Sequence, residues 1–369
     1  MSRVSTRSRA VAGFVVLALA GACGAEGRSN FPARRRPLPQ AFEEGLPETT
    51  ATRPPAPSPS PGRELSITPA AWAGGLPSLI VARGSHVTRH HNGRITAIGA
   101  VEGNAEVAFA AGAGTAIAES VSGSRSQLFK LRRNRSAERI ETSPARISLT
   151  DVAMIDGRRR ILYTTYYAPA GETTGYLYSQ ELNGSGLNRI AEASGPEYEM
   201  TRASYGGGVI VTSAWSDLTE TFGFVRPDGT EVTGRPNPTD ELPYGQPPYM
   251  SDAVLSPDGS SLAYLEGPDY DQFSEKQVGD WVVVVQDQTT GAERLRIQVS
   301  NNDVCVPWLD YDGRWLVVSR ANWTRGPDGV DECRPSASKA LAAIAFDANE
   351  PDGNAVLLTA TIGVVTIDD

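Results

Sequence analysis

All three histidines of the chain lie in one short segment, as His86, His90 and His91. Imidazole is the commonest side-chain metal ligand, and on a β-strand His86 and His90 would lie on the same face. A zinc site needs three or four protein ligands, yet no carboxylate or thiol lies near these histidines in the sequence. Asn92-Gly93 directly after them indicates a hairpin turn. We therefore expect structural or surface histidines, and we predict no metal site and no cofactor.

Sequence signatures of nucleophilic or zinc-dependent catalysis are missing. The chain contains neither a G-x-S-x-G turn, which exposes a catalytic serine, nor the H-E-x-x-H pair of zinc peptidases. The acids between residues 266 and 280 lack the glycine and asparagine pattern of a calcium loop. We assign no catalytic residue on these grounds, and binding is favoured over enzymatic activity.

The first residues have the composition of an export signal. Arg3, Arg7 and Arg9 precede an apolar run over residues 11–20. That run is too short to span the roughly 30 Å of a hydrocarbon core. Small residues at 20–22 then lead to Cys23, as a signal peptidase requires. We predict a signal peptide over residues 1–22 and an extracytoplasmic protein.

The segment Leu19-Ala20-Gly21-Ala22-Cys23 resembles a bacterial lipobox. The resemblance implies that Cys23 carries diacylglycerol through a thioether and becomes the new N-terminus. Acyl chains such as palmitate would then hold the protein in the lipid bilayer, on the extracytoplasmic face of the cell membrane. One departure is Ala20, which stands where the family prefers leucine. Residues 20–22 also fit an ordinary secretory cleavage site, so the alternative is a secreted protein.

The cysteine count favours the lipid anchor. The chain has three cysteines, and an odd thiol is a liability in an oxidising compartment. With Cys23 acylated, Cys305 and Cys333 remain free to pair. Their disulfide would close a loop of about 29 residues and contribute about 3–4 kcal/mol in the chain-entropy account. We predict this disulfide.

Charge and proline content limit the partners and divide the chain. Without residues 1–22 the protein has 31 Lys and Arg against 43 Asp and Glu, a net charge of −12. Nucleic-acid binding requires a basic face, so we expect no nucleic acid as a partner. Residues 23–66 contain nine prolines and few large apolar side chains, which predicts a disordered tether after the lipidated cysteine. Residues 67–369 are expected to form one folded domain and a monomer.

Short β-rich runs separated by glycine-containing turns recur along that domain. Four glycines spaced by 50, 52 and 54 residues each precede an apolar strand: Gly157, Gly207, Gly259 and Gly313. Glycine suits such turns because it adopts positive φ without a Cβ clash. Each period holds four strands, which is the pattern of a β-propeller blade.

Counting these periods predicts the number of blades. Five full units lie between residues 105 and 360. The remaining strands make a sixth blade and are expected at 78–83, 86–91, 94–98 and 362–367. The ring is then closed by strands from both ends of the domain, which leaves no open sheet edge at the junction. Seven blades is the alternative, if two repeats have been merged.

The run AVLSPDGSSLAYLE at 253–266 is similar to the WD40-like repeat of TolB-type propellers, whose signature is Ser-Pro-Asp-Gly followed by a strand. The match is partial at 154–164 and 308–318, where Ser-Pro is absent. The resemblance implies an all-β, six-bladed β-propeller of four-stranded blades. It implies little about activity, because the family mixes binding proteins, scaffolds and enzymes.

Aromatic residues and acids gather in the long connections of the predicted propeller. Connections between the second and third strands of a blade share one face with those between blades. Side chains of this kind suit stacking on a sugar ring or packing on a peptide, unless they fold back over their own loops. The predicted ligand face consists of Tyr166, Tyr167, Trp215, Asp217, Tyr244, Asp269, Tyr270, Asp271 and Trp323.

Two functions are consistent with these features. The first is a membrane-anchored, non-catalytic binding or scaffold module for a peptide, protein or glycan of the cell envelope. The second is a propeller-type carbohydrate-active enzyme, either a lyase or a glycosidase. The second would need a pair of carboxylates, or a His-Arg set, converging on the central channel.

Overall fold

The computed structural model describes most of the chain beyond residue 75 and two short strands before it. The described residues are 63–64, 67–69, 76–112, 114–122, 125–142, 146–167, 174–193, 199–216, 219–240, 249–267, 270–271, 276–277, 280–300, 304–322, 324–325, 331–332, 340–349, 355–359 and 364–368. The chain divides into two units, Met1–Ser58 and Pro59–Asp369. The first unit lies outside the described residues, and the second is the unit described below.

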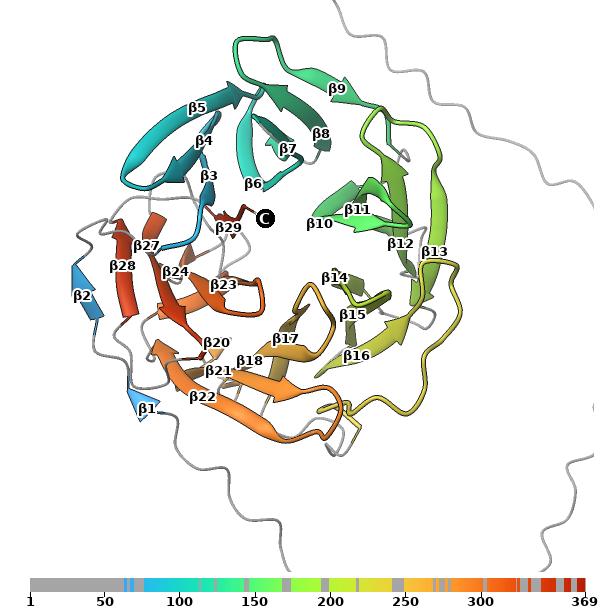
Figure 1. Ribbon diagram of the computed structural model, residues 1–369, viewed down its shortest axis with the longest axis vertical. Helices are drawn as coiled ribbons and strands as arrows, with labels where there is room; N and C mark the ends of the chain where they lie inside the picture. The colour runs from blue at the N-terminus through green and yellow to red at the C-terminus, as the bar shows by residue number, and fades with distance from the viewer. Residues whose placement is uncertain are drawn as a thin grey trace, which may run out of the picture. The chain divides into compact units, whose positions relative to one another are not determined.

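Six β-sheets surround a central axis in this unit, which confirms the predicted six-bladed propeller (Figure 1). Blade 1 consists of β29 (Val365–Ile367), β3 (Leu79–Arg83), β4 (His86–His91) and β5 (Arg94–Ala100). Blade 2 consists of β6 (Asn104–Ala110), β7 (Thr115–Ser122), β8 (Arg125–Arg132) and β9 (Glu138–Ile140). Blade 3 consists of β10 (Arg146–Ile155), β11 (Arg158–Tyr167), β12 (Thr174–Glu181) and β13 (Asn188–Ala193).

The other three blades differ in strand number. Blade 4 has β14 (Glu199–Gly206), β15 (Val209–Ser216) and β16 (Thr219–Val225). Blade 5 has β17 (Tyr249–Leu255), β18 (Ser261–Gly267), β21 (Trp281–Asp287) and β22 (Glu293–Ser300). Blade 6 has β23 (Val304–Tyr311), β24 (Trp315–Asn322), β27 (Ala340–Asp347) and β28 (Ala355–Thr359). The first strand named for each blade is its inner strand, next to the axis.

The two ends of the domain close the ring, as the sequence predicted. C-terminal β29 pairs antiparallel with β3 and becomes the inner strand of blade 1. Thr366 is fully buried there, and its hydroxyl donates a hydrogen bond of 2.6 Å to the carbonyl of Ala108 in blade 2. Blade 1 is thereby joined to its neighbour by a strand that lies more than 250 residues away in the sequence.

Apolar side chains fill the space between neighbouring blades. The described residues form six buried clusters, one at each junction of two blades. At the junction of blades 5 and 6, for example, Val283 and Leu265 pack with Val318 and Ile344. Burying such side chains on both faces of each sheet stabilises the ring through the hydrophobic effect, at about 25 cal/mol per Å² of apolar surface.

The Ser-Pro-Asp-Gly motif locks the turn of blade 5 onto the turn of blade 4. The Ser256 hydroxyl and the amide of Ser260 both donate hydrogen bonds to Asp258. The carbonyl of Pro257 accepts a 2.9 Å bond from the amide of Gly207. A Cβ atom on Gly206 would lie 2.0 Å from the carbonyl oxygen of Ser256, so the two turns approach this closely only because that residue is glycine.

Strand directions give the ring two different faces. The turns between first and second strands lie on one face, called the turn face, at residues 111–112, 156–157, 207–208, 256–260 and 312–314. Strands β11, β15, β18 and β24 end on the opposite face, called the loop face. Two hairpins follow β18 and β24, formed by β19 (Tyr270–Asp271) with β20 (Lys276–Gln277) and β25 (Thr324–Arg325) with β26 (Asp331–Glu332).

Blade 4 has three strands in the described part of the chain, where the repeat predicts four. Within residues 226–240, the pairing after β16 is an isolated bridge between Val225 and Glu231. The side chains of Asn237 and Thr239 instead bond the carbonyl and the amide of Phe222, at 2.9 and 3.2 Å. These side chains satisfy the outer edge of β16 in place of a strand, which removes the exposed edge that an incomplete blade would present.

Two short N-terminal strands cover the outer edges of blades 5 and 6. β1 (Arg63–Glu64) pairs parallel with β22, and β2 (Ile67–Pro69) pairs parallel with β28. Figure 1 shows both strands on the periphery of the ring. The last residues of the segment predicted as a tether are therefore part of the propeller sheets. No helix in the described part of the chain has the length and apolar character needed to cross a bilayer.

Candidate functional site

The residues of the predicted ligand face fall largely outside the described part of the chain. Tyr166 and Tyr167 end β11, Trp215 lies near the end of β15, and Tyr270 and Asp271 form β19; their side chains are not described. Asp217, Tyr244, Asp269 and Trp323 lie outside the described residues. β11 and β15 both run toward the loop face. A ligand bound by these side chains stays a prediction.

The predicted cysteine chemistry also stays a prediction. Cys305 lies in β23, in register with Ala321 of β24. Cys23 and Cys333 lie outside the described residues. The three histidines lie on β4 of blade 1, where His90 is buried and His86 and His91 are exposed. Burial lowers the pKa of His90. The described residues contain no group of three or more His, Cys, Asp or Glu placed to hold a metal ion.

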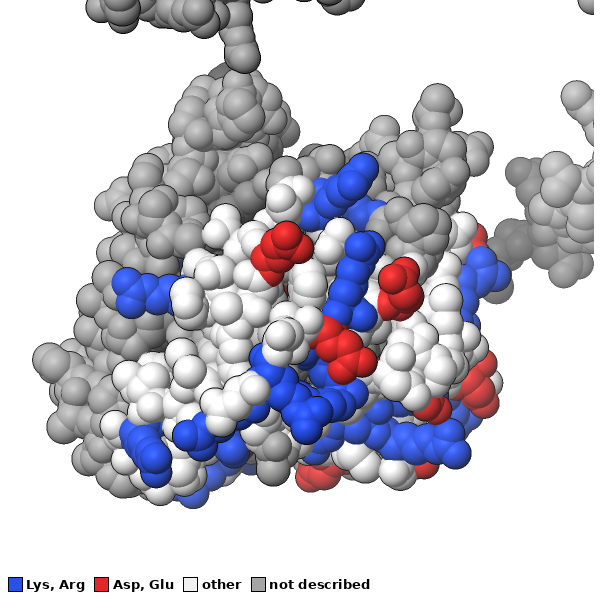
Figure 2. Space-filling view, turned by 90° about the horizontal axis from the view of Figure 1, so that it is seen from above, with Lys and Arg blue, Asp and Glu red and all other residues white. Residues whose placement is uncertain are grey.

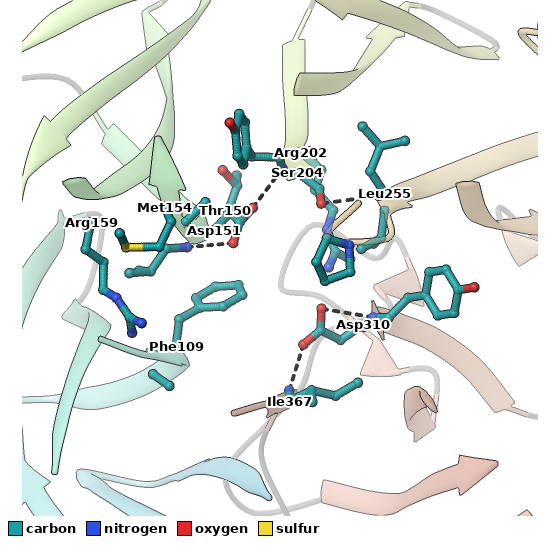
Figure 3. Close-up of a pocket in the computed structure, with 17 residues that line it drawn as sticks. Phe109, Thr150, Asp151, Met154, Arg159, Arg202, Ser204, Leu255, Asp310 and Ile367 are labelled. Atoms are coloured by element: carbon teal, nitrogen blue, oxygen red, sulfur yellow. Dashed lines mark hydrogen bonds between the residues drawn. The ribbon is translucent and has the colours of Figure 1, made fainter. Parts of the chain in front are cut away.

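A cavity of about 320 Å³ lies at the centre of the ring, toward the turn face (Figure 3). Its walls come from the last residues of the inner strands and from the turns that follow them, such as Leu255 and Pro257 of blade 5. Polar residues in it come from several blades: Asp151, Arg159, Arg202, Ser204 and Asp310. The sequence predicted a site on the loop face, whereas this cavity opens toward the opposite end.

β-Bulges direct polar side chains toward this centre. The pairing of each of the inner strands β6, β10, β14, β17 and β23 with its second strand is interrupted by a register shift. A bulge adds an unpaired residue and redirects the side chains after it. Asp151, Arg202 and Trp308 are each the first residue paired again after the shift in their strands.

Three side chains from alternate blades meet across the channel. The guanidinium carbon of Arg202, from blade 4, lies 3.9 Å from the ring centroid of Trp308 in blade 6. The ring of Trp308 lies 5.8 Å from that of Phe109 in blade 2. Strands from alternate blades can touch only across the axis, so this stack, named the axial stack, crosses the channel.

The positive charge of Arg202 is balanced by an ion pair with a neighbouring carboxylate. Arg202 is only 2 % exposed, and its Nη1 lies 3.0 Å from Oδ1 of Asp252 in blade 5. Its Nε has no hydrogen-bond partner among the described residues. Cation–π contact and the ion pair together compensate part of the cost of removing this guanidinium from water.

The two carboxylates of the cavity accept hydrogen bonds from backbone amides of neighbouring blades. Asp151 accepts hydrogen bonds from the amide of Val152 and, at 2.9 Å, from the amide of Tyr205 in blade 4. Asp310 likewise accepts from the amides of Tyr311 and of Ile367, the latter at 2.8 Å and from blade 1. Figure 3 shows both pairs of bonds. These acids are fixed in position by the backbone of two blades each.

Withdrawal from water changes the acidity of the central carboxyls. It raises the pKa of Asp310 to about 6, and the negative charge of Asp151 adds to this effect, whereas Arg202 opposes it. Burial also raises the pKa of Glu119 and of Glu220 to about 8 each. Glu119 accepts a 2.8 Å bond from the amide of Leu149, and Glu220 accepts one from the hydroxyl of Thr201. Both glutamates are accordingly mostly protonated at neutral pH.

The sequence carried a weak signal for this site that motif reasoning missed. Asp151 and Arg202 are charged residues near the middle of strands whose other central residues are mostly small or apolar, a few positions before a glycine turn. Charged residues in such a position are costly unless the fold pairs them. Asp151 and Arg202 occupy similar positions before the glycine turns of successive repeats. This shared position indicates that both side chains lie at the central channel.

Comparison with known proteins shows similarity of fold alone. No protein-family model matches the chain, and no curated protein matches its sequence. Among solved structures, TolB from Acinetobacter baumannii superposes with a TM-score of 0.45 and 12% identity, over 78% of this chain and 65% of TolB. Oligogalacturonate lyase from Vibrio parahaemolyticus superposes with a TM-score of 0.44 and 12% sequence identity, over 81% of this chain and 78% of the lyase.

A prolyl endopeptidase is also similar, with a TM-score of 0.40 and 12% identity, over 70% of this chain and 34% of the endopeptidase. The chain thus spans less than two thirds of the length of both TolB and the endopeptidase. The strand order of this chain itself establishes the six-bladed propeller that the resemblance to TolB-type repeats implied.

The raised pKa values of Glu119 and Glu220 predict a pH-dependent stability. Glu119 and Glu220 keep their protons in the folded protein up to about pH 8, whereas they ionise near pH 4 to 5 in the unfolded chain. The unfolded state therefore binds fewer protons, and the free energy of unfolding falls as the pH rises from about 5 to about 8. Each group contributes a slope of up to about 1.4 kcal/mol per pH unit in this window.

Urea denaturation across that range measures the effect. Glu119→Gln and Glu220→Gln keep a side-chain oxygen acceptor but cannot ionise, so each variant should lose less stability than the wild type between about pH 5 and about pH 8. The exposed Glu138→Gln serves as the control and should keep the wild-type slope. Wild-type slopes in both buried variants would contradict the assignment of protons to these glutamates.

Proposed function

We propose that this chain is an extracytoplasmic lipoprotein whose propeller acts as a non-catalytic binding module. Acyl chains on Cys23 hold it at the outer face of the cell membrane. The proline-rich segment separates the propeller from the bilayer. The ring then binds a peptide, protein or glycan of the cell envelope.

The observation that carries the binding role is the rigid polar cavity at the centre of the ring. Its carboxylates are positioned by backbone amides from two blades each, so they lose little freedom when a ligand binds. A volume of about 320 Å³ suits one or two side chains or one sugar unit rather than a folded partner.

The same bonds favour binding over catalysis. A general acid or base must exchange a proton with the substrate, and its lone pairs must be available for that purpose. Asp151 and Asp310 already accept two amide bonds each, which occupy about half of the lone-pair sites of a carboxylate. One bond on each acid joins neighbouring blades, so moving the acid toward a substrate would loosen the ring. The alternative, a carbohydrate-active enzyme, is favoured by one observation, the raised pKa of Asp310 near a buried arginine.

Membrane anchoring is tested by changing the proposed acylation site. Cys23→Ala should move the protein from the membrane fraction to the soluble extracytoplasmic fraction once the membranes are washed with high salt, because the variant lacks the proposed acylation site. The salt wash removes protein that is held by charge alone. Mass spectrometry of the N-terminal peptide should show diacylglycerol in the wild type alone. A wild-type protein that is soluble and cleaved without a lipid would establish the secreted alternative.

Ligand entry into the cavity is tested by site-specific photocrosslinking in cells. The probe is placed at Met154, which lines the cavity and is 50% exposed, and at Ser122, which is exposed at the loop-face end of β7 and lies outside the cavity. We expect an envelope molecule to crosslink from position 154 and not from position 122. Equal crosslinking from both positions, or none from 154, would contradict a ligand in this cavity.

Activity on glycans separates the two functions. Purified protein is incubated with isolated envelope glycans, and release of unsaturated or reducing ends is followed. The binding proposal expects no release above that of the Asp310→Asn variant. Release by the wild type that is lost in Asp310→Asn, with the fold retained, would replace the proposal with an enzyme.

A further inference from the structure

Exposed arginines gather on the turn face of blades 1 to 3. Arg94 directly follows the turn between β4 and β5, and Arg133 and Arg135 lie in the turn between β8 and β9. Arg159, which is half-buried, lies at the start of β11 and borders the cavity. The amide of Arg133 donates to the carbonyl of Gly114, which places the outer turn of blade 2 beside its inner turn. These four residues are named the arginine arc.

The charges of the arginine arc are not neutralised within the described part of the chain. None of its four side chains forms an ion pair or a hydrogen bond with another described residue. Two acids at this end of the ring are already bonded to other arginines, Asp368 to Arg89 and Glu181 to Arg158. Two further exposed acids lie on this face, Asp156 in the turn before β11 and Glu138 at the start of β9. The arc therefore carries a local positive charge on a chain whose net charge is −9.

The turn face of blades 4 to 6 carries charges of both signs. Exposed Arg226, Arg294 and Arg314 lie there, and Arg314 pairs with Asp347. The turns of these blades contain aspartates that accept hydrogen bonds from backbone amides two or three residues ahead: Asp228, Asp258, Asp287 and Asp312. Figure 2, an edge-on view of the ring from the top of Figure 1, shows basic side chains along its lower rim, with a few acidic ones among them. The arginine arc therefore adds positive charge to the turn face of blades 1 to 3, whereas bonded aspartates are frequent on the turn face of blades 4 to 6.

We propose that the arginine arc docks the turn face of blades 1 to 3 onto the anionic phospholipid headgroups of a bilayer. Guanidinium groups bind phosphate oxygens well, and each basic residue near an anionic bilayer strengthens binding about fivefold. Acidic residues elsewhere on the ring repel such a surface little, because salt screens charges beyond about 10 Å. The proposal rests on the proposed membrane anchor only in so far as the anchor keeps the protein beside a bilayer.

A lipid surface fits the arc better than a protein partner does. The arginines lie on exposed turns of three different blades, and a bilayer presents phosphate over a wide, adaptable surface without requiring complementary shape. Because blades 4 to 6 present aspartates on the same face, docking would tilt the ring. The half of the cavity mouth beside those blades would then stay accessible.

Vesicle binding tests the arc without depending on acylation or on an envelope ligand. The protein is the chain from residue 23 onward with Cys23→Ala, mixed with phosphatidylcholine vesicles with or without about one third phosphatidylglycerol. We expect binding to the anionic vesicles alone, weakening as salt rises. The variant Arg94→Gln/Arg133→Gln/Arg135→Gln should bind on the order of a hundredfold more weakly.

The matched control removes three exposed arginines from the loop face of the same blades. It is Arg83→Gln/Arg125→Gln/Arg146→Gln. It changes the net charge equally and should alter binding by no more than about threefold, as expected for charges beyond a Debye length from the surface. Thermal unfolding verifies that both variants fold. Equal losses in the two variants, equal binding to both vesicle types, or no binding would overturn the proposal, and none of these outcomes bears on Cys23 or on the cavity.

Discussion

The inner strand of each blade has one edge that no strand of its own sheet can cover, and the structure depends on satisfying that edge. An unpaired backbone amide removed from water costs about 1–3 kcal/mol. Side chains of the preceding blade accept these amides: Glu119 for Leu149, Asp151 for Tyr205, Ser204 for Leu255 and Asp310 for Ile367. The blades are therefore joined by directional bonds as well as by apolar packing.

This constraint explains why carboxylates lie at the centre of the ring. A carboxylate can accept amides from its own strand and from the next blade at once, which a hydroxyl does less well. Their charge is balanced only in part, by Arg202, and the raised pKa of Asp310 reflects that imbalance. The cavity is consequently polar, and its acids are held in position by backbone amides of neighbouring blades.

Local sequence patterns were sufficient to predict the ring, its six blades and its closure by β29, because turns and strand alternation are short-range properties. Gly157, Gly207, Gly259 and Gly313 all adopt positive φ, as the repeat of glycine turns implied. The axial stack was not predictable in this way. Phe109, Arg202 and Trp308 are about a hundred residues apart in succession, and bulges that no periodicity reveals direct the last two inward. The pairing of β1 with β22 was missed because proline-rich composition indicated a tether.

Hydrogen exchange at single amides tests the central role of these inter-blade bonds most directly. The amides of Leu149, Tyr205, Leu255 and Ile367 face away from their own sheets, yet the account predicts that they exchange only when the whole ring opens. Their opening free energies should match those of amides in the middle of β24 to within about 1 kcal/mol. Exchange as fast as that of an exposed turn amide such as Asn134 would show that the side-chain acceptors do not hold the ring together.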